Sequence, residues 1–143
     1  MLHESPGVSR GLAKTARDIM NTPVVAASPN ATAREVATYM LLGGFSGMPV
    51  MAKDGSIVGV VTELDLLRCL RRGDALETTH IRDIMTRDVI SVEASTPVED
   101  VMRILDVERI QRVPVMEDGR VIGVVSRPEI VRAAVNPQLM RVV

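Results

Sequence analysis

The sequence repeats itself once, and this duplication constrains the fold more than any other feature. The segment ARDIMNTPVV at 16–25 returns as IRDIMTRDVI at 81–90. The segment SGMPVMAKDGSIVGVVTELD at 46–65 returns as QRVPVMEDGRVIGVVSRPE at 111–129. Each copy has roughly 50–60 residues, close to the smallest size that folds alone. We therefore expect two similar halves whose apolar faces pack together, and not a long array of repeats.

Both copies are predicted to have the order helix, strand, helix, strand, strand, helix. Thr32 with Glu35, and Thr96 with Glu99, have the spacing of a capping box at a helix start. Asp-Gly dipeptides between apolar runs predict hairpins, and the runs IVGVV and VIGVV indicate strands covered on both faces. The expected elements are short helices around 19–20 and 84–85, extended segments 24–26 and 89–92, helices 32–42 and 97–108, strands 48–51, 57–61, 113–116 and 121–125, and last helices starting at Thr62 and Ser126.

Four glycines have an expected structural role. The pair Gly43-Gly44 is predicted to end the first long helix. Gly59 and Gly123 lie in the middle of predicted strands, where the usual cause is the close approach of another backbone.

Composition excludes several classes of function. The net charge is −1 and the aromatic content is 1%, which argues against a nucleic-acid surface and against stacking on single strands. The single cysteine, Cys69, forms no intrachain disulfide and suits a reducing compartment. No apolar run approaches the ~20 residues of a membrane span, and the first residues lack the apolar stretch of a secretory signal. We expect a cytoplasmic protein that contacts neither nucleic acid nor membrane.

Nothing in the sequence predicts catalysis. There is no nucleophile–base pair, no spacing of metal ligands and no Gly-Lys-Ser/Thr phosphate loop. We therefore predict no catalytic residue, no metal site and no required cofactor, and we expect that the protein is not an enzyme.

The stretch GVVTELD at 59–65 allows two interpretations. Thr62 and Asp65 have the spacing of a helix cap, in which the carboxylate also favours the positive end of the helix. A carboxylate held in a first helical turn can instead accept hydrogen bonds from both hydroxyls of a ribose, as acidic residues do in dinucleotide folds. The two roles are compatible, and the spacing alone favours the cap.

The recurring motifs resemble those of a tandem pair of cystathionine β-synthase (CBS) domains, the Bateman module. The matching residues are DIM before the first strand, MPVM and VPVM in the second, and G-V-V-[TS]-x-x-[DE] after the third. The resemblance implies an α+β fold of two tandem βαββα repeats related by pseudo-two-fold symmetry, with small sheets packed face to face and helices outside. The expected bounds are a flexible tail at 1–13, a first repeat at 14–73, a linker at 74–79, a second repeat at 80–135 and a tail at 136–143.

The resemblance also implies where a ligand binds. The Asp65 carboxylate takes the ribose, and the other repeat adds contacts, among them Arg112, whose planar guanidinium suits a phosphate. The alternative role for Arg112 is that of an exposed strand-edge charge that discourages aggregation. The first site is predicted at Val60, Thr62, Asp65, Thr86, Val89, Ile90 and Arg112. Arg87 and Arg82 are further basic residues near this site.

The second site departs from the family pattern. Glu129 stands where the first repeat has Asp65, and Ser126 where it has Thr62. The longer side chain keeps the cap but displaces the carboxylate by about one methylene. Arg109 and Arg112 precede the second Pro-Val, where the first repeat has Ser46 and Gly47. We predict a weak or empty second site at Thr22, Val24, Val25, Ser126 and Glu129.

The preferred interpretation is a regulatory protein that binds an adenosine-containing ligand between its repeats and signals by changing conformation. The candidate ligands are AMP, ADP, ATP, S-adenosylmethionine and NAD, among which the sequence does not choose. The alternative is a structural dimerisation module with vestigial nucleotide sites. In both cases we expect a homodimer formed through the helical faces, and an effector protein that the sequence does not identify.

Overall fold

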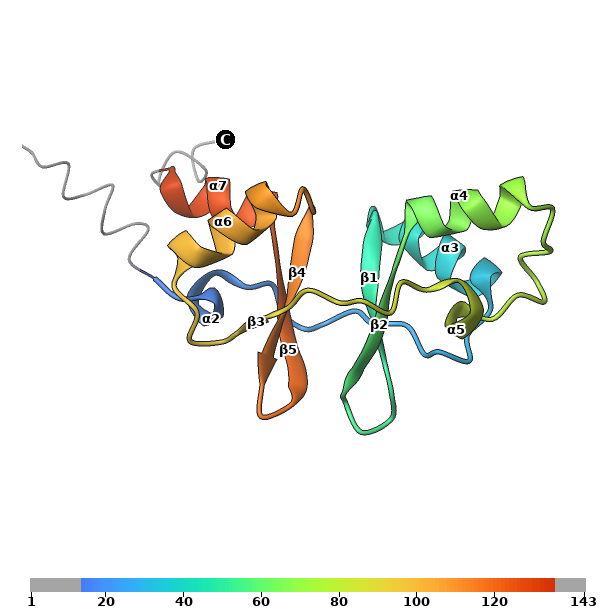
Figure 1. Ribbon diagram of the computed structural model, residues 1–143, viewed down its shortest axis with the longest axis horizontal. Coiled ribbons are helices and arrows are strands. Elements are labelled where there is room, and N and C mark those ends of the chain that lie inside the picture. The colour runs from blue at the N-terminus through green and yellow to red at the C-terminus, as the bar shows by residue number, and fades with distance from the viewer. Residues whose placement is uncertain (1–13, 136–143) are drawn as a thin grey trace, which may run out of the picture. The chain divides into compact units, whose positions relative to one another are not determined.

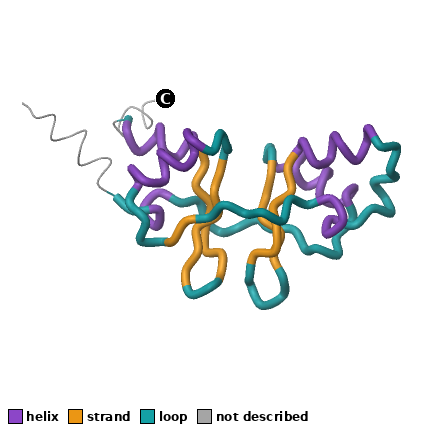
Figure 2. The backbone as a smooth tube through the Cα atoms, in the orientation of Figure 1, coloured by secondary structure: helices purple, strands orange, loops and turns teal. Residues whose placement is uncertain are grey.

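The computed structural model describes residues 14–135, and the predicted tails at 1–13 and 136–143 lie outside this range. The chain divides into two compact units. Unit 1 takes its residues from Met1–Val24 and Ile90–Val143, and unit 2 consists of Val25–Val89. Each unit has its own small sheet, whose strands are orange in Figure 2. Each unit also has its own apolar core.

Unit 2 is built around a two-stranded hairpin (Figure 1). Strand β1 pairs antiparallel with β2, and Ala27 adds an isolated parallel bridge to Val50. The helices bury Val36, Met40 and Leu66 against the hairpin. The elements are α3 (Ala33–Gly43), β1 (Gly47–Met51), β2 (Ile57–Thr62), α4 (Glu63–Arg71) and α5 (Ile81–Ile84).

Unit 1 has the same plan with one more strand. Strand β3 runs parallel to β4, and β4 pairs antiparallel with β5. Val113, Val115 and Val125 are buried in its core. The elements are α2 (Ala16–Ile19), β3 (Val92–Glu93), α6 (Val98–Val107), β4 (Arg112–Glu117), β5 (Arg120–Ser126) and α7 (Arg127–Ala134). The α+β class, with two tandem repeats, is therefore confirmed.

Two local predictions need correction. The segment 24–26 forms no strand, and the isolated bridge to β1 lies one residue later, where Ala27 pairs with Val50. Helix α6 begins after Pro97, and Thr96 does not cap it, because the Thr96 hydroxyl accepts a hydrogen bond from the Glu93 amide at 3.1 Å. A hydroxyl that turns back to the preceding loop is not available to the helix.

The two short helices are exchanged between the repeats. Helix α2 comes before the first repeat's hairpin but packs in unit 1, where the Ala16 amide donates to the Thr96 carbonyl at 2.8 Å. Helix α5 comes at the start of the second repeat but packs in unit 2, where the Ile81 amide donates to the Ala31 carbonyl at 2.9 Å. The sequence repeats and the compact units are therefore different stretches of chain.

This exchange explains why the Asp-Ile-Met and Gly-Val-Val motifs occur together. A Cβ atom placed on Gly59 would lie 2.7 Å from the Met85 sulfur and 2.8 Å from the Thr86 carbonyl oxygen. A Cβ atom on Gly123 would meet the Met20 side chain, with Cγ at 2.7 Å. Each glycine therefore makes room for the methionine that ends a short helix, and at Gly59 the expected close approach of another backbone is confirmed.

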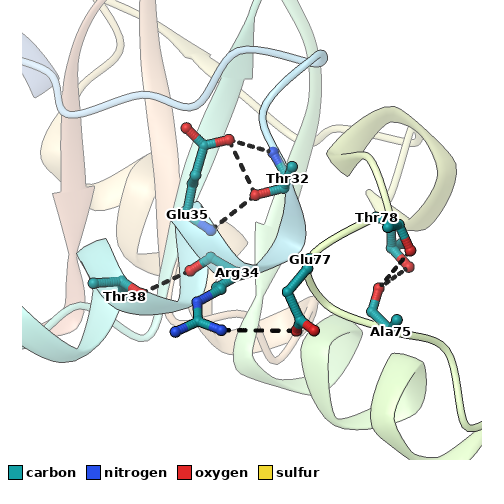
Figure 3. Close-up of polar contacts among 8 residues, drawn as sticks. Thr32, Arg34, Glu35, Thr38, Ala75, Glu77 and Thr78 are labelled. Carbon is teal, nitrogen blue, oxygen red and sulfur yellow. Dashed lines mark hydrogen bonds and ion pairs between the residues drawn. The ribbon is translucent and has the colours of Figure 1, made fainter.

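The start of α3 is held by the segment that was predicted to be a linker (Figure 3). The Thr32 hydroxyl accepts from the Glu35 amide at 3.1 Å, and the Glu35 carboxylate accepts from the Thr32 amide at 2.9 Å, so the predicted capping box is present. The hydrogen bonds that this carboxylate accepts, first from the Thr32 amide and then from the Thr32 hydroxyl, lower the pKa of Glu35. The carbonyls of Leu76 and Thr79 accept from the next two helix amides. The segment 75–79 therefore completes the helix start.

The long helices end differently in the two units. Helix α3 is capped by Gly44 in the left-handed region with φ of 71°, as predicted. Register along β1 and β4 aligns Gly44 with Arg109, and not Ser46 with Arg109 as the sequence suggested. Arg109 adopts the same left-handed conformation, with φ of 56°, and a residue with a Cβ atom is strained there.

Replacing Arg109 by glycine is expected to stabilise the protein by about 0.5–1 kcal/mol, because glycine adopts positive φ without a steric penalty. Arg109→Ala removes the same charge but keeps the Cβ atom, so we expect no gain from it. Urea unfolding of both variants measures the difference. A gain for alanine equal to that for glycine would show that the backbone strain is not the cause.

Candidate functional site

The Asp65 side chain is the central polar group of unit 2. It is only 6% exposed, although it carries a carboxylate. Its Oδ2 atom accepts hydrogen bonds from the Thr62 amide at 2.9 Å and the Thr62 hydroxyl at 3.2 Å. Its Oδ1 atom accepts from the Thr86 hydroxyl at 3.3 Å. Because burial of a carboxylate is unfavourable without such partners, these contacts hold the group in place.

Backbone hydrogen bonds to strand β2 place Thr86 beside Asp65. Thr86 and Val60 exchange two hydrogen bonds, each of 2.8 Å, between their amides and carbonyls. The preceding Met85 lies against Gly59, so α5 and strand β2 are in close contact. The hydroxyl of Thr86 is thereby placed beside the first turn of α4.

Asp65 and Thr86 lie at the wall of an open pocket of about 470 Å³ in unit 2. Its charged residues come from one face of α4 and from the segment around α5. Arg72 forms an ion pair with Asp74, with Nε and Oδ2 3.0 Å apart. The remaining lining residues are Arg68, Thr79, Asp83, Ile84 and Met85. A polar group of a ligand can therefore approach the Asp65 carboxylate from this side.

The corresponding carboxylate of unit 1 has different partners. Glu129 is 7% exposed, and its Oε1 atom accepts from the Ser126 amide at 2.7 Å and from the Ser126 hydroxyl. Its Oε2 atom accepts from Arg132 at 3.3 Å. Arg132 lies three residues after Glu129, as Arg68 lies three residues after Asp65, but Arg68 makes no such contact. Glu129 is therefore paired with its own helix, whereas Asp65 is paired with Thr86.

Sequence reasoning missed the residue that corresponds to Thr86. Asn21 forms the same bridge to β5 in unit 1: its amide donates to the Val124 carbonyl at 2.8 Å. Thr22, which was expected at the second site, is the counterpart of Arg87. The signal was present in the sequence, because Asn21 and Thr86 both directly follow the Asp-Ile-Met triplet.

The predicted site residues are divided between the two units. Unit 2 holds Val60, Thr62, Asp65, Thr86, Arg87 and Val89, and also Val25 from the second predicted site. Unit 1 holds Ile90, Arg112, Thr22, Val24, Ser126 and Glu129. Within unit 2 the structure brings together Val60, Thr62, Asp65 and Thr86. The Arg87 side chain donates to the Arg82 carbonyl at 2.8 Å.

Residues 14–135 contain no group of three or more His, Cys, Asp or Glu side chains that could hold a metal ion. Cys69 is a buried free thiol on α4. Among the described helices, none has the length and apolar character needed to cross a membrane.

The family model of the CBS domain matches the chain twice, at residues 16–72 and 81–136. The chain therefore belongs to the CBS domain family and contains a tandem pair of these domains. No catalytic family is indicated by this match.

Relatives of the chain include large enzymes and small proteins. Inosine-5'-monophosphate dehydrogenase of Methanocaldococcus jannaschii is 28% identical over 131 residues, which cover 90% of this chain but only 25% of that enzyme. Hypoxic response protein 1 of Mycobacterium tuberculosis is 26% identical over 119 residues, covering 82% of this chain and 83% of that protein.

Solved structures that are similar to this chain include the CBS domain pair of protein MJ0100 in complex with 5'-methylthioadenosine and S-adenosyl-L-methionine. It has a TM-score of 0.75 and 29% identity, and the match covers 84% of this chain and 94% of that one.

Proposed function

We propose that this protein is a regulatory CBS pair that binds an adenosine-containing ligand at Asp65 and Thr86. The observation that carries the proposal is the buried Asp65 carboxylate, which is fixed by Thr62, touches Thr86 and lines an open pocket. The related pair of protein MJ0100 binds two adenosine derivatives, which supports the same class of ligand here.

A ribose hydroxyl would donate a hydrogen bond to Asp65 in place of the Thr86 hydroxyl. The Thr86–Asp65 hydrogen bond is long, at 3.3 Å, so a ribose hydroxyl can replace it at little cost. The second oxygen of Asp65 stays bound to Thr62 and keeps the orientation of the group. Val60 is partly exposed, and the family resemblance predicts that it contacts the base. Contributions of Val89, Ile90, Arg87 and Arg112 to base and phosphate remain predictions of the family resemblance.

The positions of Asp65 and Thr86 in the sequence explain how ligand binding can change the conformation of the protein. Asp65 belongs to the first repeat and Thr86 to the second, although both are part of unit 2. A ligand that binds both residues therefore joins α4 to the end of α5. It changes the population of conformations only to the extent that it binds one arrangement better than another.

A direct test is thermal unfolding and calorimetric titration with AMP, ATP, S-adenosylmethionine and NAD. We expect one of them to bind and to raise the unfolding temperature, because a ligand of the native state stabilises it. The ultraviolet spectrum of freshly purified protein adds a simple check. The chain has one Tyr and no Trp, so a co-purified adenine would dominate its spectrum. No binding and no shift with any of the four would contradict the proposal.

We also propose that the protein is a cytoplasmic homodimer which acts on a separate effector protein. The helices expose large apolar side chains that favour burial against another surface. If the protein forms dimers but binds no adenosine ligand, the alternative of a dimerisation module with vestigial sites is the better description.

A further inference from the structure

Two side chains of opposite charge line the pocket beside Asp65 without pairing with each other. Arg68 lies on α4, three residues after Asp65, and Asp83 lies on α5, three residues before Thr86. Among the described residues, neither the Arg68 guanidinium nor the Asp83 carboxylate has an ion pair or a hydrogen bond. Two walls of the pocket therefore each carry an unpaired charge close to the proposed ribose contacts.

The equivalent side chains of unit 1 are both paired within that unit. Asp18 is the counterpart of Asp83, and it accepts hydrogen bonds from the Thr15 amide at 2.9 Å and the Thr15 hydroxyl at 3.1 Å. Arg132 is the counterpart of Arg68, and it donates to the Glu129 carboxylate at 3.3 Å. Unit 1 therefore offers neither charge to a ligand without breaking an internal contact.

Two differences in sequence release these charges in unit 2. His80 stands where unit 1 has Thr15, and its side chain makes no capping hydrogen bond at the start of α5. Asp65 is one methylene shorter than Glu129, and its oxygens accept from Thr62 and Thr86 instead of from the arginine that follows. Arg68 and Asp83 are also exposed to solvent, so both are accessible to a ligand in the pocket.

The charges of this pocket suit a zwitterion better than a phosphate. Three carboxylates and two guanidinium groups line it, so its net charge is negative, and Arg72 is already paired with Asp74. A phosphate at Arg68 would be repelled by Asp83, and such a repulsive element discriminates between ligands. An α-amino-acid group has a carboxylate for Arg68 and an ammonium for Asp83, and both contacts are charge-assisted.

We propose that Arg68 and Asp83 select an adenosine ligand that carries an α-amino-acid group over nucleotides that carry phosphates. The selected class contains S-adenosylmethionine and S-adenosylhomocysteine. The inference rests on the proposed function, because it specifies which kind of candidate ligand the Asp65 site takes. Asp65 binds the ribose, and the two charges three residues away bind the amino-acid group. The phosphate contact predicted for Arg112 is then not used by the preferred ligand.

Calorimetric titration with two adenosine thioethers tests the preference. S-adenosylhomocysteine and 5'-methylthioadenosine share the adenosine and the sulfur, and only the first carries the amino-acid group. We expect the unmodified protein to bind S-adenosylhomocysteine roughly tenfold to hundredfold more tightly than 5'-methylthioadenosine, and AMP more weakly than S-adenosylhomocysteine. Arg68→Ala and Asp83→Asn should each lower the affinity for S-adenosylhomocysteine about tenfold, with little effect on 5'-methylthioadenosine.

Unit 1 supplies the matched controls. Arg132→Ala and Asp18→Asn remove the equivalent side chains there and should leave both affinities unchanged. Asp83→Lys replaces the repelling carboxylate by a cation, so we expect it to strengthen the binding of AMP while weakening that of S-adenosylhomocysteine.

The outcomes separate this inference from the proposed function. Equal affinities of the unmodified protein for the two thioethers would overturn it, and so would a preference that neither Arg68→Ala nor Asp83→Asn reduces. Tighter binding of AMP than of S-adenosylhomocysteine would also overturn it, while supporting an adenosine site at Asp65. Absence of binding by every adenosine compound would contradict the proposed function itself, and this inference with it.

Discussion

Replacing Asp65 by alanine is expected to abolish tight binding of the adenosine ligand. The substitution removes the acceptor of the ribose hydroxyls while Val60 and Thr86 stay in place. Losing a hydrogen bond to a charged group costs about 1.5–3 kcal/mol, which corresponds to a loss of affinity of roughly tenfold to hundredfold for each contact. Calorimetric titration well below the unfolding temperature measures this effect.

Two further variants separate binding from helix capping. Glu35→Ala removes the same kind of capping carboxylate from α3, in the same unit but away from the pocket. It should lower the stability slightly, because the Thr32 amide and hydroxyl lose their acceptor, without changing affinity. Glu129→Ala removes the carboxylate of unit 1 and should leave tight binding within a few-fold. Loss of binding in Glu129→Ala with normal binding in Asp65→Ala would show that the ligand binds in unit 1, and would contradict the proposed site.

Replacing Gly59 by alanine should reduce both the stability and the affinity for ligand. The added methyl group would lie 2.8 Å from the Thr86 carbonyl oxygen and 2.7 Å from the Met85 sulfur, so the backbone of Thr86 has to move. Overpacking of this kind costs about 1–3 kcal/mol. Displacing Thr86 also moves one wall of the pocket beside Asp65, so we expect weaker binding at temperatures where the protein remains folded.

Gly123→Ala is the matched control for this effect. The new methyl group meets only the Met20 side chain among its nearest atoms, and it lies in unit 1, which does not contain Asp65. Denaturant unfolding should show a loss of stability, whereas titration should show nearly unchanged affinity. Equal losses of affinity in the two variants would indicate a general effect of destabilisation.

Much of the local structure could be predicted from the sequence, because it depends on neighbouring residues. The Asp-Gly turns define the hairpins, and the capping boxes at Thr32, Thr62 and Ser126 set the starts of three helices. The cap at Thr96 was the exception. A hydroxyl there can serve the helix or the preceding loop, and the spacing to Glu99 does not distinguish these partners.

The exchange of the short helices could not be predicted in this way. Met20 and Met85 follow the same triplet, and Gly59 and Gly123 lie in the same motif, so either methionine fits either glycine equally well. Only the path of the connecting chain decides which pair forms. The family resemblance predicts Thr86 and Asp65 in one site. For unit 1 it predicts Thr22, whereas Asn21 occupies the position equivalent to Thr86.

The division of the chain into one continuous and one interrupted unit has a consequence for synthesis on the ribosome. All of unit 2 lies within Val25–Val89, so its partners are complete once that stretch has emerged. Helix α2 and the following Asn21 are made earlier, but their hydrogen-bond partners at Thr96 and Val124 are made much later. Domains fold as units when their chain is available. We therefore expect unit 2 to fold first, while the segment around Met20 waits, without its packing partners, for the last strand of the chain.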